Sequence, residues 1–102
     1  LGDHNFDQHV AASDVPVVVA FWAPWCAPCR MMAPAFAETA SRMEPAARFV
    51  KLNTDEAQQV AARYGIRSIP TLIVFKGGRE VARQPGAMAT TQLMRWVQEA
   101  LS

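Results

Sequence analysis

The chain has 102 residues, enough for one small domain and too few for two, so we expect a single domain over residues 1–102. About half of the residues (51%) are hydrophobic and 19% are charged, a balance typical of proteins that build their own core. The formal net charge is only +1. The basic residues are scattered rather than clustered, so we expect neither nucleic-acid binding nor a role at a membrane surface. No apolar run approaches the ~18 residues of a membrane span, so we expect no such span.

The first predicted elements are a short helix and a buried strand. Asp3 is placed to cap the helix, and Phe6 and Val10, four residues apart, would share its inward face. Pro16–Trp22 is a continuous apolar run rich in β-branched residues. Such a run indicates a strand that is buried on both faces, as in a parallel sheet.

A long helix is predicted next, from about Pro28 to Met43. Its apolar side chains recur at helical spacing, at Met32, Phe36, Ala40 and Met43. Pro34 lies inside this pattern and should kink the helix, because proline lacks an N–H and crowds the carbonyl of Arg30. Ala47–Asn53 is then predicted to be a second strand.

Capping and turn signals predict the third helix and the last two strands. Asp55 should cap the helix, with Gln58 at the capping-box position and Gly65 as its stop. Thr71–Phe75 is an apolar strand. The turn sequence "KGG" leads from it into Arg79–Gln84, so these two strands should form a hairpin.

The chain ends in a predicted helix, "TTQLMRWVQEAL", with Leu93, Val97 and Leu101 facing inward. The resulting order is helix, strand, helix, strand, helix, strand, strand, helix. This order predicts an α/β sandwich around a central mixed sheet, with helices on its faces and a C-terminal β-hairpin plus helix.

The only two cysteines, Cys26 and Cys29, directly follow the buried strand. A bridge between them would close a very short loop, and a disulfide stabilises less when its loop is short, so a purely structural role is disfavoured. A structural zinc site needs about four ligands. The two cysteines and the two histidines, His4 and His9, could supply them only if the two pairs came together in the fold. We therefore expect no metal site.

Redox chemistry fits the cysteine pair better. Cys26 lies at the start of the long helix, where free N–H groups and the helix dipole favour the thiolate, which is the nucleophilic form. Cys29 is one turn further on, within disulfide reach, and Pro28 fixes the backbone between them. Cys26 can therefore attack a disulfide and Cys29 can resolve the intermediate. We expect Cys26 to be partly exposed and Cys29 to be nearly buried.

Two segments resemble the thioredoxin family. "FWAPWCAPCRMMAPAF" is similar to its active-site segment and "YGIRSIPTLIVFKGG" to its second signature, and the resemblance continues through Pro85–Ala87 to the final helix. It implies the thioredoxin fold over nearly the whole chain, with Cys26 as the attacking thiol and Cys29 as the resolving one. It also implies a cis bond before Pro70, and an apolar substrate-binding strip that includes Trp25, Ile69, Pro70, Gly86 and Ala87.

The chain departs from the family pattern in three places. Ala27 replaces the usual Gly in the dipeptide that tunes the redox couple, so the resemblance leaves the potential open. Ala20 stands at the family's buried aspartate, which helps to move the proton of the resolving cysteine, and Lys51 matches the lysine beside it; we therefore expect reduced but not abolished activity. The family's first strand precedes Leu1, so we expect that strand to be short or missing, an N-terminal segment to have been removed, and the Arg48–Leu52 strand to lie at a sheet edge.

The resemblance implies an enzyme, a protein-disulfide reductase that works by dithiol–disulfide exchange in cell redox homeostasis. No nicotinamide or flavin motif is present, so we expect no bound cofactor, and NADPH would act through a partner, a flavin-containing thioredoxin reductase. The other implied partners are disulfide-containing proteins, and we expect a cytoplasmic monomer with a weak tendency to self-associate. Two alternatives stay open, a non-catalytic binding module with the same fold and a dedicated oxidant.

Overall fold

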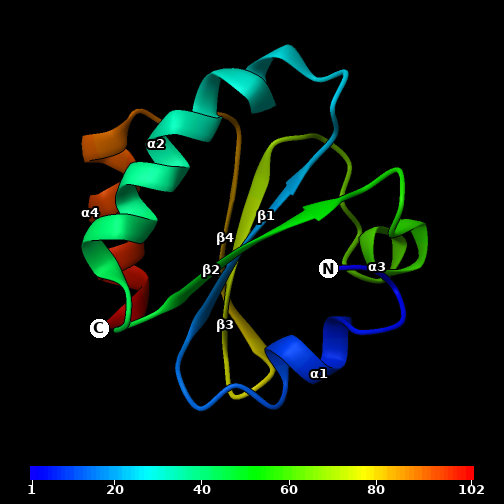
Figure 1. Cartoon of the computed structure of the whole chain (residues 1–102), viewed down its shortest axis with the longest axis horizontal. Coiled ribbons are helices and arrows are strands. Elements are labelled where there is room, and N and C mark those ends of the chain that lie inside the picture. The colour runs from blue at the N-terminus through cyan, green and yellow to red at the C-terminus, as the bar shows by residue number, and fades with distance from the viewer.

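Helices and strands follow one another in the predicted order, and the strands assemble into one mixed sheet (Figure 1). The computed structural model describes residues 1–102. Its elements are α1 (Phe6–Val10), β1 (Val17–Trp22), α2 (Ala27–Met43), β2 (Arg48–Asn53), α3 (Gln58–Arg63), β3 (Thr71–Lys76), β4 (Arg79–Pro85) and α4 (Thr90–Leu101). The strand order is β2-β1-β3-β4, with β1 and β2 parallel and the other two pairs antiparallel. The predicted α/β fold is therefore confirmed.

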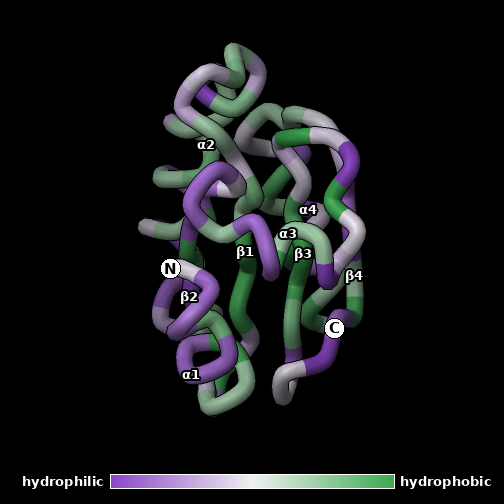
Figure 2. Tube along the Cα trace, turned by 90° about the vertical axis from the view of Figure 1, so that its right-hand side faces the viewer, coloured by the Kyte–Doolittle hydropathy of each residue, from purple (hydrophilic) through white to green (hydrophobic).

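Helices cover both faces of the sheet, with α1 and α3 on one side and α2 and α4 on the other (Figure 1). Successive side chains of a strand point to opposite faces, so Val17 and Val19 pack toward α1 and α3 while Val18 and Ala20 pack toward α2 and α4. This double burial explains why β1 is apolar throughout. Figure 2 shows β1 and β3 as hydrophobic strands in the middle of the molecule. None of the helices combines the length and the apolar character that a membrane crossing requires.

Both predicted N-caps are wrong. Asp3 makes no capping bond to α1. Its carboxylate instead accepts hydrogen bonds from the backbone N–H groups of Gln59, at 3.3 Å, and Val60, at 2.9 Å, in the first turn of α3. Asp55 does not cap α3, whose N-cap position is Ala57. The N–H groups of α3 are thus satisfied from a distant part of the chain, which local capping patterns cannot reveal.

The predicted stop of α3 at Gly65 is confirmed. Gly65 has a φ of +62°, a conformation that glycine adopts without strain. Its N–H donates to the carbonyl of Ala62 at 3.0 Å, and the N–H of Ile66 donates to Ala61 at 2.9 Å. These two bonds form a Schellman motif, which satisfies the last carbonyls of the helix.

The inward face of α2 follows the predicted pattern, with deeper burial in its first half. Met32 and Phe36 are buried, Ala40 is half-buried, and Met43 is half-buried against the same core. Thr39, outside the predicted pattern, is fully buried. Burial of Thr39 is possible because its hydroxyl donates to the carbonyl of Ala35 at 2.8 Å. Pro34 lies inside the helix and does not end it. The predicted kink there stays a prediction.

The sheet has β2 at one edge, as predicted, because no strand occurs before β1. Along β2 the N–H groups of alternate residues point toward β1, beginning with Arg48, which donates to Pro16 at 2.8 Å. The N–H of Phe49 points outward and donates to the carboxylate of Glu44 at 3.2 Å. One of the outward donors of this edge is therefore already occupied within the chain.

The predicted C-terminal hairpin and helix are both present. Lys76 pairs with Arg79 around Gly77 and Gly78, which have φ values of +59° and +80°, as a tight hairpin turn requires. In α4, the predicted inward side chains Leu93 and Val97 are fully buried, and Leu101 is half-buried.

Candidate active site

Cys26 and Cys29 form a disulfide at the N-terminal end of α2, with their Cα atoms 5.3 Å apart. Cys26 is the N-cap residue, and its Sγ accepts a hydrogen bond from the backbone N–H of Cys29 at 3.2 Å. Pro28 lies in the first turn, where its missing N–H removes no helical hydrogen bond. The sulfur therefore takes the place of a capping oxygen, in surroundings that stabilise negative charge on it when the pair is reduced.

The predicted difference in exposure between the two cysteines is wrong. Cys26 is 4% exposed and Cys29 is 5% exposed, so both are buried in the disulfide form. They cluster with Ala23, and Ile69 packs against that cluster. Cys26 Sγ lies 3.6 Å from the carbonyl oxygen of Ile69. The loop before β3 therefore covers Cys26 Sγ, which was predicted to be partly exposed.

The loops that precede β3 and follow β4 meet beside the disulfide. The Ile69–Pro70 peptide bond is cis, and Pro70 is buried. The carbonyl of Pro70 accepts a hydrogen bond from the N–H of Gly86 at 2.8 Å. Gly86 and Ala87 are exposed. The structure thus brings Ile69, Pro70 and Gly86, from the predicted substrate strip, together near the cysteine pair.

Trp25 lies immediately before Cys26 and is 68% exposed. Its indole Nε1–H donates to both carboxylate oxygens of Asp55, at 3.0 and 3.3 Å. A groove of about 200 Å³ runs beside the ring, lined by Trp25, Thr54, Ala61, Ile66, Arg67, Ser68 and Ile69. The role of Asp55 could not be predicted from the sequence, because its partner lies 30 residues away and no local pattern marks the contact.

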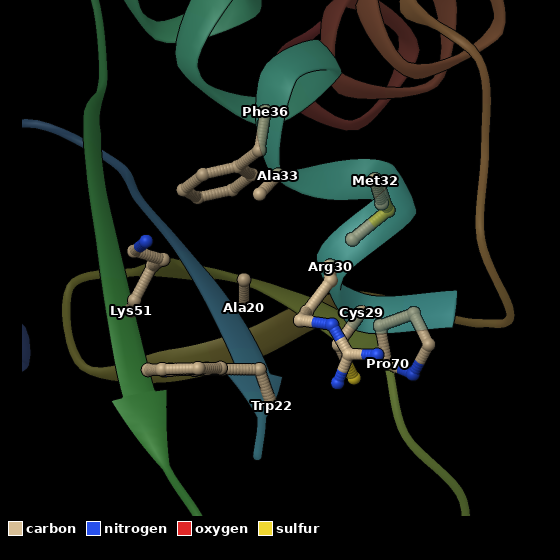
Figure 3. Close-up of a pocket in the computed structure, with 9 residues that line it drawn as sticks. All are labelled: Ala20, Trp22, Cys29, Arg30, Met32, Ala33, Phe36, Lys51 and Pro70. Atoms are coloured by element: carbon tan, nitrogen blue, oxygen red, sulfur yellow. The ribbon is translucent and has the colours of Figure 1, made fainter. Parts of the chain in front are cut away.

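A small cavity of about 60 Å³ lies behind the disulfide (Figure 3). Its walls are formed by Ala20, Trp22, Cys29, Arg30, Met32, Ala33, Phe36, Lys51 and Pro70. Two predicted supporting residues, Ala20 and Lys51, thus meet Cys29 here, and Arg30 is an addition that no sequence signal indicated. None of the nine residues is acidic. The ammonium of Lys51 lies 5.2 Å from the ring centre of Trp22, and the Arg30 guanidinium donates to the carbonyl of Pro24 at 2.8 Å.

His4 and His9 do not join the cysteines. The chain contains no group of three or more His, Cys, Asp or Glu side chains that could hold a metal ion.

The chain matches the family model described as Thioredoxin over residues 1–99. It is 54% identical over 99 residues to Thioredoxin 1 of Nostoc sp., covering 97% of this chain and 92% of that protein. It is 42% identical to Thioredoxin of Haemophilus influenzae, with the same coverage of both chains. It is 46% identical over 102 residues to the chloroplastic M-type thioredoxin of Chlamydomonas reinhardtii, covering all of this chain and 73% of that protein.

Proposed function

The chain belongs to the thioredoxin family, and on this basis we propose which role each site residue has in the reduction of protein disulfides. The protein is a thiol-disulfide oxidoreductase that reduces protein disulfides by dithiol–disulfide exchange. The observation that carries this function is the Cys26–Cys29 pair at the N-terminal end of α2, where the first cysteine caps the helix with its own sulfur. A non-catalytic module with this fold has no need of such a pair.

In the proposed cycle, Cys26 is the attacking thiol and Cys29 the resolving one. The Cys26 thiolate attacks one sulfur of a substrate disulfide, that bond breaks, and the released substrate sulfur takes up a proton. Cys29 then loses its proton and attacks Cys26 Sγ, which frees the second substrate thiol. Two electrons pass to the substrate, and the pair is left as the observed Cys26–Cys29 disulfide. The assignment is supported by Cys26 being the N-cap, which favours its thiolate.

We propose that the substrate peptide binds along Trp25, Ile69, Pro70, Gly86 and Ala87. This assignment is supported by the exposed ring of Trp25 beside a groove and by the bond between the Pro70 and Gly86 loops. An extended peptide could hydrogen-bond to the exposed backbone of these loops, as in strand addition. Such hydrogen bonds recognise the backbone of the substrate peptide rather than its side chains, which suits a reductase that acts on many proteins.

Four further residues are proposed to support the chemistry. Ala27 and Pro28 set the backbone between the cysteines and so tune the redox couple, with Ala27 replacing the usual Gly of the family. Ala20 supplies no acid or base beside Cys29, so we propose that the release of the Cys29 proton is slower than with a carboxylate at this position. Lys51 borders the same cavity and places a positive charge at its edge.

The dithiol must be regenerated after each turnover. We propose that NADPH supplies the electrons through a flavin-containing thioredoxin reductase, with no cofactor held by this chain itself. The proposed location is the cytoplasm, where thiols are kept reduced and structural disulfides are rare. The proposed state is a monomer with weak self-association along the edge of β2.

Insulin reduction, with NADPH and a thioredoxin reductase present, tests this proposal. The native chain should reduce insulin in a reductase-dependent way, and Cys26→Ser should abolish turnover. Cys29→Ser should instead trap a mixed disulfide between Cys26 and the substrate, visible on a non-reducing gel, while Cys26→Ser/Cys29→Ser should trap nothing. Turnover that persists in Cys26→Ser, or a Cys29→Ser variant that traps no substrate, would contradict the assigned roles.

A further inference from the structure

The cavity behind the disulfide is a small apolar space with two cations at its edge. Most of its walls are carbon and sulfur, from residues such as Ala20, Met32 and Phe36. Figure 3 shows the methyl group of Ala20 lying between Lys51, which comes from β2, and Arg30, which comes from α2. Both cations are solvent-exposed, so they lie where the cavity meets the surface.

Neither of these cations is neutralised within the chain. The ion pairs of the protein are Arg42–Glu38, Arg63–Asp7 and Arg83–Glu80. Lys51 has only its contact with Trp22, and Arg30 has only its hydrogen bond to a backbone carbonyl, which leaves most of its guanidinium donors free. The cavity therefore combines room for a few atoms, an excess of positive charge and no acidic side chain.

We propose that this cavity binds a small monocarboxylate, such as formate or acetate, with its oxygens toward Arg30 and Lys51 and its apolar end toward Ala20. A guanidinium suits a carboxylate because its fork of N–H groups matches the two oxygens. The size also fits, since a single water needs about 10 to 15 Å³ of such space, so a cavity of about 60 Å³ accepts roughly four non-hydrogen atoms. The site is separate from the strip proposed to bind substrate peptides, although Cys29 and Pro70 border it.

The expected affinity is modest. The binding energy that each non-hydrogen atom of a very small ligand can supply has a ceiling, which puts the dissociation constant of formate at about 1 mM at best. The two cations are exposed, and exposed ion pairs contribute little, which weakens binding further. We therefore expect half-saturation between about 1 and 100 mM.

Methyl NMR of the oxidised protein tests the proposal without any turnover, so the result does not depend on the catalytic assignments. Formate is exchanged stepwise for pivalate at constant total salt, because pivalate is too large for the cavity and ionic strength then stays fixed. The methyl signals of Ala20 and Met32, which line the cavity, should shift and saturate. Those of Ala12 and Met94, which do not line it, should stay in place.

Variants test separately the contribution of the two cations and that of the cavity volume. Arg30→Met and Lys51→Met should each weaken binding by about 1.5- to 5-fold, as expected for one exposed ion pair, and the double variant should weaken it by about 2- to 25-fold. Arg42→Met, which removes an exposed cation elsewhere on α2, should bind like the native chain. Ala20→Leu should abolish binding by filling the space, and the milder Ala20→Val should weaken it.

Three results would overturn the proposal. The first is the absence of any saturable shift with formate. The second is an equal shift with formamide, which has the shape of formate without its charge. The third is equal behaviour of native chain and double variant.

Discussion

The methyl group of Ala20 faces a cavity that also borders Cys29 and Lys51. A carboxylate at this position could accept the proton that Cys29 must lose before it resolves the mixed disulfide. A positioned general base typically contributes about 10²- to 10⁴-fold in rate, and the lower end of that range applies to a chain that already turns over without one. We therefore expect Ala20→Asp to speed insulin reduction near neutral pH by up to about 100-fold.

The same substitution should destabilise the fold. Ala20 is 3% exposed, and a poorly paired buried carboxylate costs about 1 to 3 kcal/mol of unfolding free energy. The denaturant midpoint of Ala20→Asp should therefore fall. Ala20→Asn is the matched control, since it has a similar size without an acid–base group and should lower the midpoint without raising turnover. Unchanged turnover of Ala20→Asp between about pH 6 and 9 would remove position 20 from the proton path.

Residues differ in how far the sequence reveals their roles. Cys26 and Cys29 could be predicted as a redox pair because their chemistry depends on local spacing and on the helix that begins between them. The bond from Trp25 to Asp55 could not, because the two residues meet only when α3 and the end of β1 come together. The burial of Cys26 escaped prediction for a related reason, since the loop that covers it carries Ile69.

At the scale of elements, α3 depends on a residue near the start of the chain. It is only six residues long, too short to be stable alone, and its first free N–H groups are bound by the carboxylate of Asp3. Asp3→Ala should lower the unfolding free energy by about 1 kcal/mol, the usual effect of losing a side-chain cap. Denaturant unfolding measures this, with Asp14→Ala as the control, because Asp14 is exposed and makes no side-chain hydrogen bond or ion pair. Equal midpoints for the two variants would refute the capping role.

The hairpin of β3 and β4 contains an ion pair that depends on a bulge. Val74 pairs with Ala82 but Phe75 pairs with Glu80, so Val81 is the extra residue in β4. Residues three apart in a regular strand point to opposite faces, and the extra residue lets Glu80 and Arg83 meet, at 2.8 Å. The side-chain hydrogen bond from Arg83 lowers the pKa of Glu80 below its ordinary value.

This lowered pKa predicts a pH-dependent contribution to stability. The contribution is fully present above the ordinary pKa of glutamate and is lost as the pH falls through the lower pKa of the folded state. The pair is partly exposed, so solvent screening keeps its contribution below about 1 kcal/mol. Native chain and Glu80→Gln should therefore differ in denaturant midpoint at neutral pH, and their midpoints should converge as the pH falls below the ordinary pKa of glutamate. Glu99→Gln, which removes an exposed and unpaired carboxylate, should show no such convergence.

The order of the elements was predictable and their contacts were less so. The continuous apolar run in β1 predicted burial on both faces, because only a central strand needs apolar residues at every position. The hairpin was predictable from Gly77 and Gly78 in its turn, and the final helix from the spacing of Leu93 and Val97. The cap of α3 and the bulge at Val81 depend on which elements become neighbours, and no periodicity in the sequence encodes that.

At the scale of the whole molecule, the sheet separates two cores and ends in two open edges. One core lies between the sheet and α1 with α3, and the other between the sheet and α2 with α4. The disulfide lies at the end of β1, where the parallel strand pair meets the start of α2. The redox site is therefore held at the end of a central strand that is buried on both faces, while the outer strands β2 and β4 form the edges of the sheet.

The edge formed by β2 is where we expect two copies of the chain to associate at high concentration. Its outward N–H groups invite pairing with another strand, and the Glu44 carboxylate already binds that of Phe49. Glu44→Ala frees this donor and removes a negative charge, so self-association should strengthen by about 2- to 10-fold, as expected for one hydrogen bond. Sedimentation velocity over a concentration series measures the effect. Glu38→Ala is the control, because Glu38 pairs with Arg42 on exposed helix surface away from the edge and should associate like the native chain. If native chain and Glu44→Ala both remain strictly monomeric at every concentration, the edge of β2 is protected by something other than this carboxylate.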